Sequence, residues 1–474
     1  MSINLRKIGT NLYQLEEIPP MRAKAVVYCK EEMIPSLQKD LSLQQLAEAA
    51  MLPKVVSPVI GMPDIHEGYG LPIGGVMATE GLLSVGAVGM DINCGVRLLT
   101  SSISYDSKEI PPEKLRLLMN KIVKQIPVGV GGERKKLPPR IDFESLCLLG
   151  AEAVVKAGYG QPEDLSSIEE NGKLAGAKIA AITPKALKRA PKEIGTLGSG
   201  NHFIEIQKLE KIYIPEIAEK WGLFEGQLCL MIHSGSRALG HQTCTDYTEI
   251  FWQAKDKYKI EIPRKGLAAL FWETKEAQDY FAAMASCVNF AFANRQLMTH
   301  FVRESFAEVF SSSGATNLEL LYDVCHNVAK WEPATTNGKK LYLIHRKGAT
   351  RALPKDHPLL HKKFEKTGQP AIVPGSMGSA SYVLIGTPKA KETFFSVNHG
   401  AGRQMSRSEA IRNISRQEFE SSMGQVIYNL PYAKIVDEAP GAYKDIDLVI
   451  ETLVEAGITQ KVAKLIPLAV IKGD

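Results

Sequence analysis

Apolar residues recur at steps of three and four positions along residues 265–311. This spacing places them on one face of an α-helix, whereas a strand would alternate them at every second position. We therefore predict one long helix over residues 265–311. Nothing in its apolar stripe requires a ligand, so we interpret the stripe as core; it comprises Ala277, Phe281, Met284, Val288, Ala291, Met298 and Val302.

Shorter runs of apolar and β-branched residues predict strands. They mix with helical segments without a steady strand–helix–strand rhythm, and the chain has no internal repeat. This mixture favours an α+β fold, with mixed β-sheets flanked by helices, over a doubly wound sheet. Residues 127–139 are rich in Gly, Pro and charge and are the best candidate for a mobile loop. The predicted strands are residues 23–29, 96–101, 227–232, 340–345, 380–385 and 393–397.

The composition is that of an ordinary globular protein, because hydrophobic residues make up 45% and charged residues 23% of the 474 positions. The first residues lack the apolar core of a signal peptide, and no run approaches the roughly 18 apolar residues of a membrane span. We therefore expect a cytoplasmic protein with no membrane partner. The seven cysteines form no CxxC pair, which fits a reducing compartment. The formal net charge of +5 permits an anionic partner without requiring one.

Several Gly-flanked segments carry His, Asp or Cys where predicted strands end. Glycine allows the backbone to approach a ligand closely and exposes amide donors to phosphate. A single histidine in such a turn is more often structural than a ligand, because buried polar groups usually find a hydrogen-bond partner. The segments are GMPDIHEGYGLPIGG (61–75), VGMDINCGVR (88–97), GTLGSGNHFIE (195–205), MIHSGSR (231–237), CHNVAKWE (325–332), HRKGATRA (345–352), VPGSMGSASY (373–382) and SVNHGAGRQMSR (396–407).

Asp91 and Cys94 lie three residues apart, so a single turn could direct both side chains to one point. A thiolate can bridge two metal ions, while imidazoles and a carboxylate complete the coordination. Imidazole and thiolate favour late transition metals and carboxylate accommodates Mn²⁺, so Mn, Zn and Co all remain open on ligand type. Taken alone, Cys94 would be interpreted as a small buried residue.

Basic side chains within the same segments are candidates for binding an anion, because guanidinium groups suit bidentate phosphate contact. The chain has no GxxxxGK(S/T) loop, and its Gly-rich segments do not match GxGxxG. It also lacks the KxDG motif of lysine-dependent nucleotidyl-transferring ligases, so any covalently bound nucleotide needs another nucleophile. The candidate anion-binding residues are Arg237, Lys347, Arg351, Arg403 and Arg407.

Ten motifs, taken together, resemble the RtcB family of RNA-splicing ligases from about residue 62 to residue 473. The resemblance implies a single compact α+β domain of the RtcB type over residues 1–474. It also implies a GTP- and Mn-dependent ligase that joins RNA 2′,3′-cyclic phosphate or 3′-phosphate ends to 5′-hydroxyl ends, in tRNA splicing or RNA repair. The motifs are DIHEGYGLPIGG, DINCGVR, GTLGSGNHFIE, HSGSR, HNVAK, RKGATRA, PGSMGSASY, HGAGRQMSR, AYKDID and IKG.

The resemblance also implies roles for individual residues. His399 would be the nucleophile that carries GMP before an activated RNA(3′)pp(5′)G end forms. The metal ligands would be Cys94, which bridges two Mn²⁺ ions, with His202 and His233 on the first ion and Asp91 and His326 on the second. Guanine nucleotide would contact Asn201, His202, Phe203, Ile204, Glu205, His326, Asn327, Pro374, Gly375, Ser376, Met377, Ser381, His399, Gly400, Ala401, Gly402, Tyr443 and Lys472. Arg237, Lys347 and Arg407 would contact RNA or phosphate. The implied partners are GTP and RNA, with an archease-type activator as an open question.

Departures from the family pattern are small and remove no implied ligand; they are Ala238, Asn398 and Trp331. His66 lies in a family motif but receives no chemical role. We expect four further histidines to be non-catalytic, namely His241, His300, His357 and His361. Two alternatives remain: a dinuclear-metal phosphoesterase that hydrolyses RNA ends without joining them, and a non-catalytic RNA-binding subunit. The phosphoesterase would tolerate the loss of His399.

Overall fold

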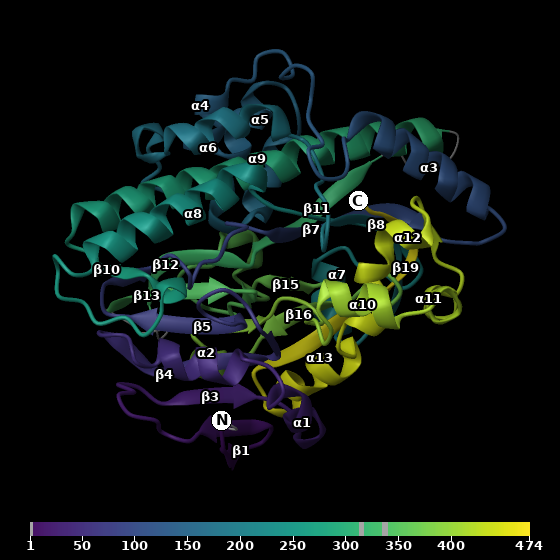
Figure 1. Cartoon of the computed structure of the whole chain (residues 1–474). Coiled ribbons are helices and arrows are strands. Elements are labelled where there is room, and N and C mark those ends of the chain that lie inside the picture. The colour runs from purple at the N-terminus through teal and green to yellow at the C-terminus, as the bar shows by residue number, and fades with distance from the viewer. Residues whose placement is uncertain (1–2, 312–316, 334–339) are drawn as a thin grey trace.

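The computed structural model describes residues 3–311, 317–333 and 340–474 of the chain. Two large sheets form the centre of the molecule, and helices cover them (Figure 1). The predicted α+β class, with mixed sheets flanked by helices, is confirmed. The predicted domain of residues 1–474 also includes residues 1–2, 312–316 and 334–339, which lie outside the described residues.

The first large sheet contains the N-terminal strands, which occupy the lower part of Figure 1. Its neighbouring strands are antiparallel, except that β3 and β4 run parallel. In spatial order the strands are β1 (Leu5–Gly9), β2 (Leu12–Leu15), β3 (Ala25–Tyr28), β4 (Val55–His66), β5 (Ile73–Thr79), β13 (Leu341–Lys347) and β12 (Asn327–Pro333).

The second large sheet combines strands from the middle and the C-terminal part of the chain, and β18 (Ile427–Tyr428) joins it beside β19, in parallel. In spatial order its other strands are β11 (Leu318–Cys325), β7 (Gly95–Ser104), β9 (Gln227–Ser234), β8 (Phe203–Ile212), β19 (Thr459–Ile471), β16 (Ser381–Gly386) and β15 (Pro370–Val373). Two small antiparallel pairs complete the strands: β6 (Leu82–Ser84) with β10 (Ala269–Phe271), and β14 (Ala349–Arg351) with β17 (Ser396–Asn398).

All six predicted strands overlap observed strands, but the one predicted at residues 393–397 was placed too early. A 3₁₀ turn at Pro388–Thr393 precedes it. Phe394 and Phe395 then adopt left-handed backbone angles, with φ of 48° and 52°, which no strand accommodates. The strand β17 therefore begins only at Ser396.

The predicted helix is α9 (Lys275–Phe310), but the start predicted at residue 265 was wrong. Residues 269–271 form β10, because they pair with β6. The helix begins after Thr274, whose Oγ1 accepts a hydrogen bond from the Ala277 amide at 3.3 Å. This side-chain cap satisfies one of the amides that a helix start leaves without an intrahelical partner.

α9 lies across one face of the second large sheet and packs against other helices (Figure 1). Its apolar stripe is core, as predicted, apart from the partly exposed Phe281. Phe290 and Phe292 of the same helix are also buried, and each such side chain contributes roughly 1.5–3 kcal/mol to folding. The helices that pack against α9 are α3 (Pro112–Gln125), α4 (Phe143–Leu149), α5 (Ala151–Lys156) and α8 (Arg237–Ala254).

The remaining helices are short and lie around the two sheets. None of the helices in the described segments is both long enough and apolar enough to cross a membrane. The short helices are α1 (Ile34–Leu37), α2 (Ser42–Ala49), α6 (Pro184–Arg189), α7 (Pro215–Lys220), α10 (Arg407–Asn413), α11 (Arg416–Met423), α12 (Tyr432–Ile435) and α13 (Ile446–Glu455).

Candidate active site

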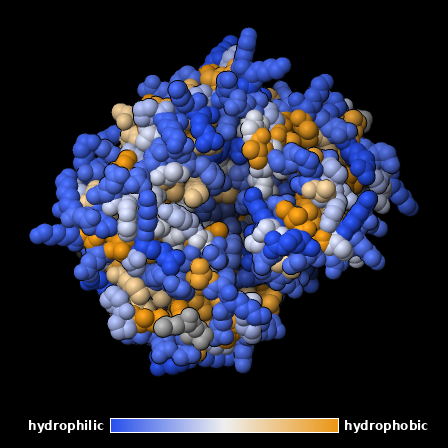
Figure 2. Space-filling view, viewed as in Figure 1, coloured by the Kyte–Doolittle hydropathy of each residue, from blue (hydrophilic) through white to orange (hydrophobic). Residues whose placement is uncertain are grey.

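Strand ends and turns from both large sheets meet at a cavity of about 470 Å³. Figure 2 shows the molecule hollowed near the centre of the view. β4 contributes His66, β9 contributes His233 and β13 contributes Lys347. The His399 turn after β17 forms another part of the wall. Residues more than 300 positions apart in the sequence thus face one space.

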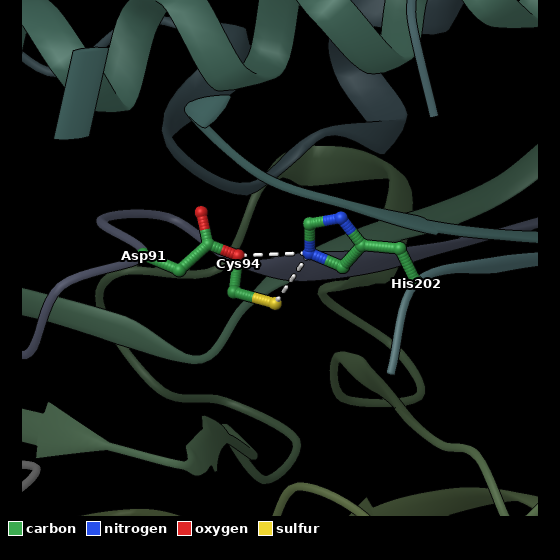
Figure 3. Close-up of side chains that lie close together, drawn as sticks. All are labelled: Asp91, Cys94 and His202. Carbon is green, nitrogen blue, oxygen red and sulfur yellow. Dashed lines mark hydrogen bonds and ion pairs between the residues drawn. The ribbon is translucent and has the colours of Figure 1, made fainter. Parts of the chain in front are cut away.

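Asp91, Cys94 and His202 form a cluster that could hold a metal ion (Figure 3). His202 Nε2 lies 2.8 Å from Asp91 Oδ2 and 3.6 Å from Cys94 Sγ. The turn between β6 and β7 brings the first two together, because the Cys94 amide donates to the Asp91 carbonyl at 2.9 Å. Asn93 in this turn has a φ of 52°, a backbone conformation that Asn tolerates better than most residues. The expectation that one turn directs Asp91 and Cys94 to a common point is confirmed.

His233 and His326 extend this cluster. His233 Nε2 lies 3.1 Å from Cys94 Sγ, and the rings of His233 and His326 are 5.8 Å apart. The buried atoms His326 Nε2 and Asp91 Oδ1 have no hydrogen-bond partner among the described residues. Thr350 Oγ1, 2.8 Å from His326 Nδ1, fixes the orientation of that ring. Unpartnered buried atoms of these types fit metal ligation, because leaving them without any partner is costly.

The electrostatics favour neutral imidazoles at His233 and His326. Burial, reinforced by neighbouring imidazoles, holds the pKa of His233 and of His326 well below 6.5. Burial and the Asp91 carboxylate raise the pKa of the Cys94 thiol well above its usual value of 9. A metal ion bound here would therefore have to displace the thiol proton, which is the usual coupling between thiolate ligation and pH.

His399 is anchored by Asp64, a residue to which the sequence analysis assigned no role. The Nδ1 atom of His399 lies 2.6 Å from Asp64 Oδ2, and Asp64 is fully buried. A proton shared between Nδ1 and the Asp64 carboxylate leaves Nε2 as the ring nitrogen that carries no proton. The His399 ring lies 5.4 Å from the ring of His326, so the candidate nucleophile borders the metal cluster. Asp64 was visible in the PDIH segment, but only a tertiary contact links it to His399.

Most residues implied for guanine nucleotide line the cavity, but three of them do not. Ile204, Glu205 and Ser381 are buried and do not line it. Glu205 accepts a hydrogen bond from Gln207 Nε2 at 2.7 Å, and burial raises the pKa of its carboxyl to about 8. The lining members are Asn201, His202, Phe203, His326, Asn327, Pro374, Gly375, Ser376, Met377, His399, Gly400, Ala401, Gly402, Tyr443 and Lys472.

The three residues implied for RNA or phosphate contact all line the cavity: Arg237, Lys347 and Arg407. Lys347 Nζ donates to the Gly86 carbonyl at 3.1 Å, and burial lowers the pKa of this ammonium to about 8. The Arg407 side chain is 58% exposed at the rim. His66 and His241 also line the cavity, whereas the other histidines expected to be non-catalytic, His300, His357 and His361, do not.

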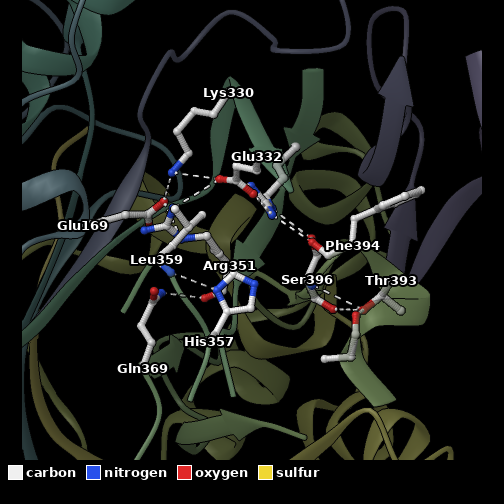
Figure 4. A network of polar contacts seen from close by, with 12 residues as sticks. Glu169, Lys330, Glu332, Arg351, His357, Leu359, Gln369, Thr393, Phe394 and Ser396 are labelled. Carbon is white, nitrogen blue, oxygen red and sulfur yellow. Dashed lines mark hydrogen bonds and ion pairs between the residues drawn. The ribbon is translucent and has the colours of Figure 1, made fainter. Parts of the chain in front are cut away.

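Arg351 is not an anion-binding residue of the cavity, and that candidate is wrong. Its guanidinium is buried in an ionic network (Figure 4), with Nη1 2.7 Å from Glu170 and 3.2 Å from Glu332. Arg346 and Lys330 bind the same Glu332. These carboxylates already neutralise Arg351, so its charge is not available to an anion in the cavity. Arg403, by contrast, lines the cavity, although Glu438 pairs with it at 3.1 Å.

Two polar residues of α9, Asn294 and Arg295, donate hydrogen bonds to the backbone segments that carry the metal cluster. Arg295 Nη1 donates to the carbonyls of Asn93 at 2.9 Å and Ser234 at 2.8 Å, and thereby joins the Cys94 turn to the end of β9. Asn294 Nδ2 donates to the Thr196 carbonyl at 3.1 Å, in the segment that leads to His202. Neither residue was anticipated, because the apolar stripe of α9 indicated only core; their signal in the sequence was a polar pair inside an apolar helix.

Fold and site together define an α+β protein with a candidate metal centre beside a carboxylate-bound histidine, in a cavity that also carries basic side chains. A family model described as tRNA-splicing ligase RtcB matches residues 45–473. The chain therefore belongs to the RtcB family.

Individual relatives match over nearly the whole chain. A tRNA-splicing ligase RtcB of Thermococcus kodakarensis is 43% identical over 462 residues, which are 96% of this chain and 95% of that protein. The tRNA-splicing ligase RtcB of Archaeoglobus fulgidus is 42% identical over 99% of both chains. An RNA-splicing ligase RtcB of Mycobacterium tuberculosis is 43% identical over 90% of this chain and 100% of its own.

Proposed function

We propose that the protein is an RNA ligase that joins 3′-phosphate or 2′,3′-cyclic phosphate ends to 5′-hydroxyl ends, using GTP, Mn²⁺ and a His399–GMP intermediate. Membership of the RtcB family supports the ligase activity. The observation that carries the mechanism is the 2.6 Å contact between His399 Nδ1 and Asp64, next to the metal cluster. With Nδ1 bound to Asp64, Nε2 is the ring nitrogen available as the nucleophile, and His399 lines the cavity.

In the first step, His399 Nε2 attacks the α-phosphorus of GTP. The bond between that phosphorus and the oxygen bridging to the β-phosphorus breaks, and pyrophosphate leaves. Asp64 stabilises the positive charge that develops on the ring, as a buried carboxylate does for the histidine of a catalytic triad. The product is a phosphoramidate in which GMP is bound to His399.

In the second step, an oxygen of the RNA 3′-phosphate attacks the phosphorus of the bound GMP. The phosphorus–nitrogen bond breaks, His399 is regenerated, and the RNA carries a 3′pp5′G end. The 5′-hydroxyl of the other RNA then attacks the 3′-terminal phosphorus; its proton is released and GMP leaves. A 2′,3′-cyclic phosphate is first opened by water, so the joining phosphate is the one already present on the RNA.

The residues of the cluster fit two metal ions that share Cys94. His202 and His233 would hold the first ion, and Asp91 with His326 would hold the second. The unpartnered Asp91 Oδ1 and His326 Nε2 support this assignment. When bound, such ions neutralise charge on phosphate oxygens.

The size and composition of the cavity support the binding of a guanine nucleotide. Its volume of about 470 Å³ lies within the range of small-molecule sites. Lys472, Arg237 and Lys347 supply positive charge for phosphates. Glu205 and Ser381 do not line the cavity, so direct contact between guanine and either side chain would require the cavity wall to rearrange. A cytoplasmic location belongs to the same proposal. Whether an archease-type activator is needed is a question that the family resemblance raises and leaves open.

The joining reaction itself tests the proposal. A 3′-phosphate RNA and a labelled 5′-hydroxyl RNA are incubated with GTP and MnCl₂, and joined RNA is measured. We expect joining that requires both additions, that fails in His399→Ala and that persists in His241→Ala, a second histidine of the same cavity. Opening of cyclic phosphate ends without joining by the wild-type protein would contradict the proposal and favour the phosphoesterase.

A further inference from the structure

A strongly basic stretch, residues 173–192, lies outside the cavity. It contains six basic residues and no acidic one, although the formal net charge of the whole chain is only +5. All six side chains are exposed, and only Lys192 forms an ion pair with a described residue, at 3.9 Å from Glu133. The six are Lys173, Lys178, Lys185, Lys188, Arg189 and Lys192.

Helix α6 concentrates this charge on one face. Thr183 caps the helix at the Ala186 amide, and Ala186 is buried against the protein. Lys185, Lys188 and Arg189 are separated by three and four positions, so they lie together on the outer face.

The stability of α6 explains only two of these charges, because Lys188 and Arg189 lie in its last turn, where the helix dipole favours a cation. Lys185 is the second residue of the helix, where the helix dipole disfavours a cation. Like charges at a spacing of three or four cost a further few tenths of a kcal/mol per pair. None of the three forms an ion pair within the described residues, so their charge is available to a partner.

This charged face adjoins the cavity. Arg189 Nη1 contacts Gln242 Oε1 at 3.5 Å, in the first turns of α8. His241, the residue before Gln242, is exposed and lines the cavity, as does Arg237 one turn earlier. Arg189 of α6 thus contacts the same helix that contributes Arg237 and His241 to the cavity wall. α6 packs beside α8 in the upper part of Figure 1.

The loop of residues 127–139 extends the same surface. The Arg134 amide donates to the Lys192 carbonyl at 2.8 Å, and the Gly129 amide donates to the Gly198 carbonyl at 2.9 Å. Lys135 and Lys136 of this loop are exposed. The loop is therefore fastened to the segment that joins α6 to the cavity.

The chemistry of the surface identifies the kind of partner. Residues 173–192 are all described, and they expose no large hydrophobic or aromatic side chain. A protein interface would carry an apolar or aromatic centre, and a membrane-binding helix would carry an apolar face. Single-stranded RNA is usually held by aromatic stacking. Lysines and arginines without such residues match the phosphate backbone of folded, base-paired RNA.

We propose that Lys185, Lys188, Arg189 and Lys192, here called the α6 surface, bind the phosphate backbone of the base-paired part of the RNA whose end occupies the cavity. This inference rests on the proposed function, because it takes the RNA end to be the substrate. The α6 surface distinguishes structured RNA from short single strands, which would reach only the cavity.

The test compares Lys185→Glu/Lys188→Glu/Arg189→Glu with a control that changes the charge equally at the opposite end of the molecule, Arg6→Glu/Lys7→Glu/Lys24→Glu. Binding of an RNA hairpin with a 3′-phosphate end, and of a short single strand, is measured by fluorescence anisotropy without GTP at several salt concentrations. Guanylylation is measured separately without RNA. A glutamine triple variant at the α6 positions serves if charge reversal impairs folding.

We expect the triple glutamate variant at the α6 positions to bind the hairpin more weakly, by about tenfold or more. The negative slope of log affinity against log salt concentration should become shallower by about 2 to 3. Short-strand binding and guanylylation should stay unchanged, and the control should match wild type. Unchanged hairpin affinity would overturn the inference. Binding to phosphatidylserine vesicles is measured in parallel, and a loss confined to vesicle binding would also overturn the inference, because it would assign the surface to a membrane. Failure of guanylylation and joining in the wild type would refute the proposed function, while the hairpin result would still decide whether the α6 surface binds RNA.

Discussion

His399 Nδ1 and Asp64 Oδ2 lie 2.6 Å apart, although 335 positions separate the two residues in the sequence. The same carboxylate oxygen accepts the backbone amides of His399 at 3.0 Å and Gly400 at 3.3 Å. Gly402 approaches Asp64 so closely that an added Cβ would meet its carbonyl oxygen at 2.2 Å. Asp64 therefore sets both the ring tautomer and the backbone of the turn.

Asp64→Asn should lower the rate of guanylylation by about 10²–10⁴-fold, because a neutral amide no longer stabilises the positive charge that develops on the His399 ring during attack. The measurement is single-turnover formation of the protein–GMP adduct. Thermal unfolding and GTP affinity serve as controls, since the Asn carbonyl can still accept a backbone amide. A wild-type rate in a folded variant would show that Asp64 does not position the nucleophile.

Cys94→Ala should reduce the metal content of the purified protein, because it removes the one ligand that both ions would share. Elemental analysis after loading with Mn²⁺ measures the ratio of metal to protein. Cys325→Ala is a matched control, since Cys325 is also a buried thiol of the same region but does not line the cavity. Equal metal content in both variants would refute the shared-ligand assignment.

Arg295→Lys should weaken metal binding by about 10–100-fold, as expected when a partner that orients metal ligands is lost. The guanidinium holds the Asn93 and Ser234 carbonyls at once, which an ammonium cannot reproduce. Arg303→Lys is the control on the same helix: Arg303 pairs with buried Asp164 at 2.6 Å, away from the cluster. Calorimetric titration with Mn²⁺ should show weaker binding for Arg295→Lys than for Arg303→Lys. Equal affinities would indicate that Arg295 stabilises the fold in general and does not orient the metal ligands.

His345 should make the fold sensitive to mild acid. Its Nε2 accepts a hydrogen bond from the Ser84 amide at 3.1 Å, and burial lowers the pKa of the ring to about 4. Because the unfolded chain binds this proton near pH 6.5, the free energy of unfolding should fall as pH drops from 6.5 to 4, by up to about 1.4 kcal/mol per unit. His345→Gln keeps a donor and an acceptor, so its denaturation midpoints should show a shallower pH dependence over that window. An unchanged slope would exclude His345 as the source.

Local patterns were enough to predict the body of α9, the approximate strand positions and the Asp91–Cys94 turn, because periodicity and turn chemistry act over a few residues. The start of α9 was missed because sheet pairing between β10 and β6 overrides the helical pattern. Arg351 was misjudged because its acidic partners Glu170 and Glu332 come from distant segments.

The candidate site was predicted from family motifs more than from spacing. Its implied metal ligands and most of its nucleotide residues line one cavity, while their chemical roles stay predictions. Asp64 and Arg295 were not anticipated, because nothing near either residue in the sequence indicates its partner. Contacts that span hundreds of positions become visible only in the folded chain.

The most direct test of the mechanism locates the nucleotide on the protein. The protein is incubated with α-labelled GTP and Mn²⁺, digested, and analysed by mass spectrometry under alkaline conditions that preserve a phosphoramidate. We predict GMP on the peptide containing His399, lost in His399→Ala and retained in His241→Ala. GMP on a lysine, on another histidine, or on no residue would contradict the account.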